Sequence, residues 1–277
     1  MSWVMSHEPV VRLGFFAGVF ILMAVWELAA PRRRLMATKG QRWFANLGIM
    51  VLSTLVVRVI FPTAAVGMAL VAAERGWGLL NNFDLNPVVS IAASVLILDF
   101  FIYLQHVMFH AVPALWRLHM VHHADVDFDV TTGLRFHPVE IVLSMLIKLA
   151  AVALLGPPAV AVIIFEVVLN ATAVFNHGNV RLPASIDRVL RLVVVTPDMH
   201  RVHHSVKSVE TNSNFGFNLP WWDRLLGTYR AQPKEGHEGM AIGLNQFQDR
   251  PRQGLLWLLA LPFTGRADGV SGLSGRG

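Results

Sequence analysis

The sequence predicts an all-α protein that crosses a membrane several times. Three observations support this fold class: 54% of the 277 residues are hydrophobic, only 15% are charged, and the apolar residues gather in long segments. Soluble domains carry about 25% charged residues, so this composition is typical of a chain that lies largely in lipid. The mean hydropathy of +0.51 agrees. We expect about four transmembrane helices, with the polar remainder of the chain forming a helical cap on one side of the membrane.

The first two apolar segments fit membrane-spanning helices. Residues 11–30 form an apolar run of the length that crosses a hydrocarbon core, about 20 residues. A signal peptide is a poorer interpretation, because the positive charges follow this run instead of preceding it. The second segment, 47–73, contains Arg58 and a Phe-Pro pair at 61–62, and a kinked or tilted helix accommodates both. Polar residues rich in glycine and asparagine at 74–86 then predict a loop.

The third apolar segment, residues 87–103, begins with a proline and runs directly into a group of histidines. The fourth region, residues 139–175, is too long for a single crossing. The Gly-Pro-Pro sequence at 156–158 lies near its middle and predicts a break, because proline ends a helix. We therefore expect a hairpin of two helices that enters and leaves on the same side. The last apolar run, 255–263, is too short to span, and we expect it on the surface or against the core.

The positive charge gathers next to the first apolar segment. The formal net charge is +5, and its densest part consists of Arg32, Arg33, Arg34, Lys39 and Arg42. Short cytoplasmic loops of membrane proteins carry such an excess of lysine and arginine, so residues 32–42 predict a cytoplasmic loop. No nucleic-acid recognition motif accompanies the charge, and we expect no nucleic-acid partner.

Three histidine clusters hold eight of the twelve histidines. They are His106-x3-His110, His119-x2-His122-His123 and His200-x2-His203-His204. Residues three and four apart share one face of a helix, about 5–6 Å apart at Cβ, so each cluster can direct its imidazoles at a common point. Imidazole is a ligand for iron, zinc, copper and nickel, and eight converging imidazoles suit one metal ion or two. The sequence therefore predicts a metal site.

Counting the membrane crossings brings the three clusters to one side. If residues 32–42 are cytoplasmic, the second segment leaves the cytoplasm and the third returns, which places His106 and His110 at the cytoplasmic face. The second cluster follows within a few residues. The hairpin at 139–175 then returns the chain to that face before the third cluster. We expect the helical cap and its histidines on the cytoplasmic side of the membrane.

The sequence excludes several kinds of metal site. The chain has no cysteine, which removes disulfides, iron–sulfur clusters and thiolate zinc sites. A closed structural zinc site uses four ligands, fewer than the clusters supply. The clusters contain neither the Glu-x-x-His pairs of carboxylate-bridged bundles nor the His-Glu-x-x-His of zinc proteases. An all-imidazole centre with two metal ions at a membrane surface remains.

These residues resemble the membrane fatty acid hydroxylase superfamily, which includes sterol desaturases and carotene hydroxylases. The three histidine clusters match the family's histidine boxes in order and spacing. The flanking sequences are similar to the bacterial sterol-desaturase-like branch: Arg135-Phe136-His137-Pro138-Val139-Glu140, Asn176-His177-Gly178-Asn179-Val180 and Trp222-Asp223-Arg224-Leu225-Leu226-Gly227-Thr228-Tyr229. The resemblance covers roughly residues 90–230.

The resemblance implies a membrane-bound, non-haem di-iron oxygenase that hydroxylates or desaturates a lipid, such as a sterol or a fatty acyl chain, at a C–H bond. It implies O2 as cosubstrate. Electrons would come from NAD(P)H through a separate redox protein, cytochrome b5-like or a ferredoxin with its reductase, because the chain has no G-x-G-x-x-G motif. The eight box histidines carry over as iron ligands. His177 is the natural further ligand, with Arg181 where a second histidine would stand, and His137 is an alternative.

Four further residues are candidates to hold the ligands in place. A metal-bound imidazole usually donates its other N–H to a carboxylate or a carbonyl group. Asp99, Tyr103 and His106 are spaced to share one helical face, and a carboxylate near the membrane interior is costly unless it is paired. Glu140, which follows the second box, and Asn176, which precedes the third, are the other candidates.

Two other classes of protein stay open. A divalent-metal transporter would place histidine or aspartate along a path at mid-membrane depth, whereas these histidines lie at segment ends. A bis-histidine haem protein needs single histidines that face each other across a bundle, which histidine doublets serve poorly. We divide the chain into N-terminal transmembrane helices at 1–86, a catalytic domain at 87–230 and a C-terminal tail at 231–277.

Overall fold

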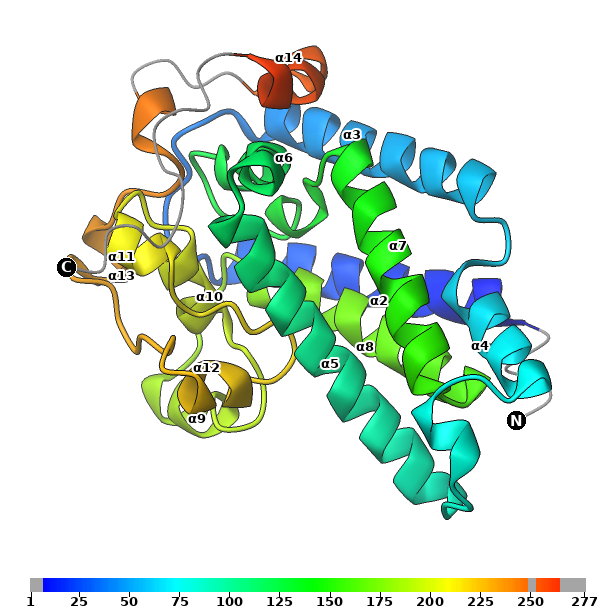
Figure 1. Cartoon of the computed structure of the whole chain (residues 1–277). Coiled ribbons are helices and arrows are strands. Elements are labelled where there is room, and N and C mark those ends of the chain that lie inside the picture. Colours follow the sequence, from blue (N-terminus) through cyan, green and yellow to red (C-terminus); the bar gives the residue numbers. More distant parts are fainter. Residues whose placement is uncertain (1–6, 249–252, 265–277) are drawn as a thin grey trace.

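The computed structural model describes residues 7–248 and 253–264, which form helices and connecting loops (Figure 1). The longer helices are α2 (Glu8–Ala29), α3 (Lys39–Ile60), α4 (Ala64–Arg75), α5 (Pro87–Ala111), α6 (Pro113–His123), α7 (Pro138–Leu155) and α8 (Ala159–Asn176). The shorter helices are α9 (Ala184–Leu190), α10 (Pro197–His203), α11 (Ser208–Thr211), α12 (Trp221–Leu225), α13 (Gly236–Gly239) and α14 (Leu255–Ala260), with 3-10 turns η1 (Leu79–Asn82), η2 (Thr132–Leu134), η3 (Asn245–Phe247) and η4 (Leu261–Phe263).

The expected all-α fold is confirmed. Within the described residues, strand-like pairing is limited to two isolated bridges, Pro31 with Val180 and Ser205 with Ile242. Two parts of the predicted C-terminal tail, 249–252 and 265–277, lie outside the described residues.

Five helical stretches are long and apolar enough to cross a membrane: Glu8–Ala29, Lys39–Asn82, Pro87–Ala111, Pro138–Leu155 and Ala159–Asn176. The mean hydropathy of their most apolar windows lies between 1.9 and 2.2. Their outer faces carry large exposed apolar side chains such as Leu13, Val59 and Leu154, which water would not favour. The chain is therefore an integral membrane protein, with one more apolar stretch than the approximate number expected from the sequence.

The second apolar segment differs from its prediction as a single kinked helix. It begins earlier than expected, with α3, and it is divided between α3 and α4. The break falls at Phe61 and Pro62, because proline lacks an N–H and its ring clashes with the carbonyl group four residues earlier. α4 then packs against both α7 and α8.

The hairpin predicted in the fourth region is confirmed. α7 ends before Gly156 and α8 begins after Pro158. Gly156 has φ +66°, a left-handed conformation that glycine adopts at little cost, and its N–H donates to Val152 O at 2.8 Å. Gly78 lies directly on the backbone of Gly156, where a Cβ atom would clash. The turn between α7 and α8 therefore meets the connection from α4 to α5 at one end of the bundle.

The opposite end of the bundle carries the cap. α6 and the short helices α9 to α13 gather there, beside the end of α5 and the end of α8 (Figure 1). The connection between α2 and α3 lies at this end too, because Pro31 pairs with Val180 and Arg32 N donates to Asn179 O at 2.9 Å. All three histidine boxes share this end. α14 packs against α3, and η4 packs against α6, so the short run at 255–263 lies against the core as expected.

The basic residues that follow the first segment are paired with acidic residues of the cap. Arg42 lies in α3 instead of a loop and is fully buried, where it donates to Asp125 and Asp129 at 2.8 Å. Arg32 forms ion pairs with Asp198 and Glu238. These ion pairs connect the adjoining ends of α2 and α3 to the cap. The basic residues therefore lie partly in a helix and not only in the loop that the sequence predicts.

Candidate metal centre

The first two histidine boxes lie on two helices that one residue joins. α5 begins with Pro87, and the Asn86 side chain caps it by accepting a hydrogen bond from Val88 N at 2.9 Å. The helix ends at Ala111, and α6 starts at Pro113. A connection this short places α6 directly against α5, which brings the two boxes together.

The third box lies on α10, a helix of seven residues. Thr196 caps its start by accepting a hydrogen bond from Met199 N, and Pro197 takes the first helical position. The last histidine of the box, His204, is the C-cap residue. His177 is the C-cap residue of α8, which packs against α10, so a transmembrane helix delivers His177 to the third box.

Nine histidines come together in two clusters. The five-histidine cluster contains His106, His110, His119, His123 and His203, and the four-histidine cluster contains His122, His177, His200 and His204. Within each cluster, one ring nitrogen from every histidine lies within 4.8 Å of the others. All nine side chains are buried. Each cluster therefore has the donor atoms and the spacing to hold one metal ion.

The two boxes of identical spacing each contribute to both clusters. His119 and His123, one helical turn apart, belong to the five-histidine cluster, while His122 belongs to the four-histidine cluster. The third box does the reverse, because its outer pair enters the four-histidine cluster and His203 enters the five-histidine cluster. Residues three and four further along a helix lie on either side of the first, so an H-x2-H-H box can serve two adjacent sites. Both clusters therefore share α6 and α10.

The ring nitrogens suit metal coordination better than hydrogen bonding. Among the described residues, no hydrogen-bond partner meets Nε2 of His106, His110, His119 or His203. In the other cluster, His177 Nε2 lies 3.2 Å from His122 Nε2 and 3.1 Å from His200 Nε2. Three nitrogens that face one another cannot all be satisfied by hydrogen bonds, since a neutral imidazole has one N–H and one lone pair. A metal ion would accept a lone pair from each ring, so the residues fit metal binding.

Burial keeps these imidazoles neutral. It lowers the pKa of His119 and that of His177 to about 3. Burial also lowers the pKa of His204 well below its usual value, and the neighbouring rings of His122 and His200 lower it further. Neutral imidazole is the form that binds a metal, so protons compete weakly with a metal ion at neutral pH.

Hydrogen bonds from outside the five-histidine cluster orient four of its rings. His119 Nδ1 lies 2.7 Å from the Oε1 atom of Glu140 in α7, one of the candidate supporting residues. The other three rings reach segment 212–215: His106 Nδ1 lies 2.8 Å from Phe215 O, His203 Nδ1 lies 2.8 Å from Ser213 O, and His110 Nδ1 lies 3.3 Å from Asn212 Oδ1. Such partners fix both the orientation of a ring and the nitrogen that carries its proton.

The sequence does not predict that residues 212–216 support the histidines. The Asp223 carboxylate holds this segment by accepting hydrogen bonds from two of its backbone N–H groups at 2.8 Å and from Thr228 Oγ1 at 2.7 Å. Tyr103 OH lies 2.9 Å from Thr228 Oγ1, so this predicted supporting residue reaches the segment through Thr228 and Asp223. The Asn-Ser-Asn sequence at 212–214, which is typical of a turn, is the signal that could have revealed it.

Aromatic rings surround the four-histidine cluster. Phe136 stacks on His122, with ring centroids 4.5 Å apart and an interplanar angle of 11°. Phe128 packs against His177 and His204, with centroids 5.5 and 5.0 Å apart. His177 Nδ1 donates to a carbonyl oxygen one turn back in α8 at 2.7 Å. Within the described part of the chain, no hydrogen-bond partner meets Nδ1 of His122, Nδ1 of His200 or either nitrogen of His204.

His137 lies outside both clusters. It is the N-cap residue of α7, and its Nδ1 accepts a hydrogen bond from Val139 N at 3.2 Å. Its Nε2 lies 3.2 Å from Leu259 O. Both ring nitrogens of His137 therefore have protein partners, and neither is directed at a cluster.

Asp99 and Asn176 contact other parts of the cap. Asp99 accepts a hydrogen bond from Trp222 Nε1 at 2.7 Å, which joins α5 to α12. Asn176 Nδ2 donates to Phe217 O at 3.0 Å. The Phe217 ring in turn packs against a ring of each cluster, so Asn176 acts on the histidines through Phe217.

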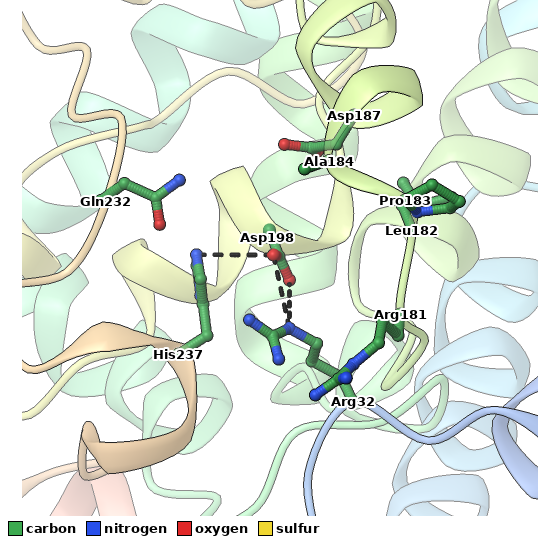
Figure 2. A pocket seen from close by; sticks show the side chains of 9 residues that line it. All are labelled: Arg32, Arg181, Leu182, Pro183, Ala184, Asp187, Asp198, Gln232 and His237. Atoms are coloured by element: carbon green, nitrogen blue, oxygen red, sulfur yellow. Dashed lines mark hydrogen bonds and ion pairs between the residues drawn. The ribbon is translucent and has the colours of Figure 1, made fainter.

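A separate polar pocket lies on the other side of α10 (Figure 2). Its volume is about 510 Å³, and it is lined by Arg32, Arg181, Leu182, Pro183, Ala184, Asp187, Asp198, Gln232 and His237. Asp198 faces this pocket, whereas His200, two residues further along α10, belongs to the four-histidine cluster. Two residues rotate a helix by about 200°, so the pocket and the clusters lie on opposite faces of α10.

The profile of the fatty acid hydroxylase family matches residues 91–228, which contain all nine clustered histidines. The chain belongs to this family. The resemblance seen in the histidine boxes and their flanking sequences is thereby confirmed. This fatty acid hydroxylase family member has no significant match among solved structures.

Several characterised proteins are similar to this family member. It is 30% identical over 174 residues to ornithine lipid hydroxylase OlsE of Rhizobium tropici, an alignment that covers 63% of this chain and 50% of the relative. It is 28% identical over 156 residues to alkylglycerol monooxygenase of Homo sapiens, an alignment that covers 54% of this chain and 33% of the relative. It is 28% identical over 141 residues to cholesterol 25-hydroxylase of Rattus norvegicus, an alignment that covers 50% of this chain and 46% of the relative. The chain spans half or less of the length of these relatives.

Proposed function

We propose that this protein is a non-haem di-iron oxygenase that hydroxylates a C–H bond of a membrane lipid with O2 and external electrons. The observation that carries this proposal is the pair of all-imidazole clusters that share α6 and α10 at one end of a bundle of apolar helices. The relatives support the reaction type, since their names describe hydroxylases and a monooxygenase.

The two clusters would hold one iron ion each. Bound iron supplies the activation of O2 that an unactivated C–H bond requires, which amino-acid side chains do not provide. The five-histidine cluster offers one ring more than the four-histidine cluster, and Glu140 holds the ring of His119 through Nδ1. The iron ligands are accordingly the eight box histidines and His177.

Two phenylalanines at the clusters suit an apolar substrate. Phe136 and Phe217 are partly exposed, although each packs against rings of both clusters. The Phe217 ring centroid lies 5.8 Å from that of His106 and 6.0 Å from that of His200. Aromatic side chains in these positions exclude water and give a lipid methylene an apolar surface beside the metal ions.

The position of the clusters argues against the two other classes. A transporter would carry its ligands along a path through the membrane, whereas the nine histidines lie at the cap end of the apolar helices. A haem protein would use two single histidines, whereas four and five rings converge here.

The electron donor is a separate redox protein that takes electrons from NAD(P)H, and the cap therefore faces the cytoplasm. Cysteine labelling tests this orientation without interference, because the chain has no cysteine. Ser208→Cys lies exposed on the cap and Asp84→Cys lies exposed at the opposite end. A membrane-impermeant maleimide added to intact cells should label Asp84→Cys and leave Ser208→Cys unlabelled until the cells are opened. The reverse pattern would contradict a cytoplasmic cap.

Comparative lipidomics tests the reaction itself. A strain that lacks the gene should lose one oxygen atom from one lipid class, and the wild-type gene should restore it. His110→Ala should fail to restore it, whereas His137→Asn should succeed, because asparagine can still cap α7 and His137 lies outside both clusters. Restoration by His110→Ala, or a lipid profile that does not change on deletion, would contradict the proposed function.

A further inference from the structure

The polar pocket behind α10 lies apart from the two histidine clusters that the proposed reaction uses. Figure 2 shows the guanidinium groups of Arg32 and Arg181 close together on one side, with His237 and Gln232 across from the wall made by Leu182 and Pro183. Its volume of about 510 Å³ lies within the range of small-molecule sites, roughly 300–1,000 Å³.

The two arginines are incompletely neutralised. Arg32 Nη1 donates to Glu238 Oε1 at 2.9 Å, and Arg181 Nη2 donates to the same oxygen, so one carboxylate serves two guanidinium groups. Glu238 belongs to α13 and its side chain is 67% exposed. The acidic residues of the lining do not correct the imbalance. Asp187 is paired with Arg191, and Asp198 is shared between Arg32 and Arg201. Glu238 and Asp198 together therefore face three guanidinium groups, those of Arg32, Arg181 and Arg201.

His237 adds a buried polar group that lacks a hydrogen-bond partner. Its side chain is only 3% exposed, and neither ring nitrogen makes a hydrogen bond within the described residues. The nearest carboxylate oxygen, Asp198 Oδ2, lies 3.6 Å from Nε2. A buried ring nitrogen without a hydrogen bond destabilises the protein, and a bound ligand that accepts its hydrogen would provide the missing partner.

The pocket lies beside exposed apolar side chains and the ends of two apolar helices. One wall comes from the start of α9, and the outer face of this helix carries Ile186 and Val189, which are 49% and 64% exposed. Arg188 lies exposed between them. Short helices with large exposed apolar residues and interspersed arginines insert into the boundary between headgroups and acyl chains. The ends of the apolar helices α2 and α8 meet beside the pocket through the bridge of Pro31 with Val180.

We propose that this pocket binds the anionic group, phosphate or carboxylate, of a membrane lipid headgroup. Arg32 and Arg181 donate to the anion, which replaces the Glu238 carboxylate between them, and His237 donates to a further oxygen. The acyl chains lie in the bilayer along α9. Because the pocket and the clusters lie on opposite faces of α10, binding is separate from the oxidation and goes beyond the proposed function.

Calorimetric titration of the purified full chain in an uncharged detergent tests this site. The probes are a short-chain phosphatidic acid, the matching diacylglycerol and inorganic phosphate. We expect the wild type to bind phosphatidic acid at least tenfold more tightly than either of the others, since only phosphatidic acid combines the anion with acyl chains. Equal affinity for inorganic phosphate would overturn the lipid as the source of the anion. Absence of binding to phosphatidic acid would overturn the site.

Variants then assign the binding to Arg181 and its partner Glu238. Arg181→Gln should weaken phosphatidic acid binding about tenfold, because it removes a charge-assisted hydrogen bond. Arg188→Gln is the matched control, since Arg188 is exposed on α9 outside the pocket, and its binding should be unchanged. Glu238→Gln should strengthen binding, because it removes the competing carboxylate. An equal loss in Arg181→Gln and Arg188→Gln, or weaker binding in Glu238→Gln, would reduce the interaction to general surface charge and contradict the proposal.

Discussion

In the five-histidine cluster, four rings face an oxygen atom outside the cluster, from Glu140 or from segment 212–215. In the four-histidine cluster, one ring makes such a hydrogen bond, and phenylalanine rings pack against the others. The two clusters share α6 and α10, are both buried and offer only imidazole rings, so beyond the one additional ring of the first cluster the difference lies in their surroundings. Aromatic rings pack against both clusters, so the hydrogen bonds from outside the cluster are what distinguishes the five-histidine cluster.

This difference predicts that the two metal ions are held with unequal strength. Hydrogen bonds to the outer nitrogen raise the basicity of an imidazole ligand and hold its lone pair on the metal, whereas packing restricts a ring without changing its basicity. We therefore expect the metal in the four-histidine cluster to dissociate first.

Removing a ring should have the largest effect. His110→Ala in one cluster and His200→Ala in the other should each lower lipid oxidation by more than about 100-fold, because losing a ligand costs more than losing a supporting partner. The measurement is product formation in cells that express equal amounts of each variant, followed by mass spectrometry. Oxidation at near-normal rates in either variant would mean that the corresponding cluster does not serve the reaction.

Removing the carboxylate behind His119 should have the next largest effect. Glu140→Gln keeps the size of the side chain but weakens its hold on His119 Nδ1, and it should lower the metal affinity of the five-histidine cluster about 10–100-fold. Competition with a chelator measures this affinity. Glu166→Gln serves as the control, because Glu166 is a buried carboxylate of α8 that pairs with Lys148 outside the clusters. Equal losses in both variants would indicate a general loss of stability.

Replacing the aromatic ring of Phe128 should have a smaller effect on metal affinity, and only at the four-histidine cluster. Phe128→Leu removes ring contacts with His177 and His204 but keeps an apolar side chain beside them, so the metal of the four-histidine cluster should bind about fivefold more weakly. Phe247→Leu makes the same change at a buried site in a separate core cluster. Mössbauer spectra of iron-57 protein would distinguish the two sites. A loss at the five-histidine cluster instead would contradict the assigned surroundings.

The order of metal loss tests the comparison without any variant. Dialysis of the loaded wild type against a chelator should remove iron in two phases, and the spectrum that survives the first phase should match that of His204→Ala, which lacks a ring of the four-histidine cluster. If the surviving spectrum instead matches that of His123→Ala, the five-histidine cluster holds its metal more weakly and the prediction is reversed. A single phase of iron loss would mean that the two clusters hold their metals equally strongly.

The features that depend on local spacing could be predicted from the sequence, and the features that depend on contacts between distant residues could not. Histidines three and four apart on helices can be recognised directly, and so can the Gly-Pro-Pro break at 156–158. Glu140 was identifiable because it follows the second box closely. The division of each H-x2-H-H box between two clusters was not, because it depends on how α6 and α10 face each other. The burial of Arg42 was hidden for the same reason, since Asp125 and Asp129 lie more than 80 residues away.

Metal content combined with X-ray absorption of the purified full chain tests most directly that the nine imidazoles hold two metal ions, one in each cluster. The account predicts two metal ions for each chain, with nitrogen and oxygen neighbours and without sulfur, as all-imidazole clusters require. One metal ion for each chain, or sulfur among the neighbours of the metal, would contradict the two-cluster account.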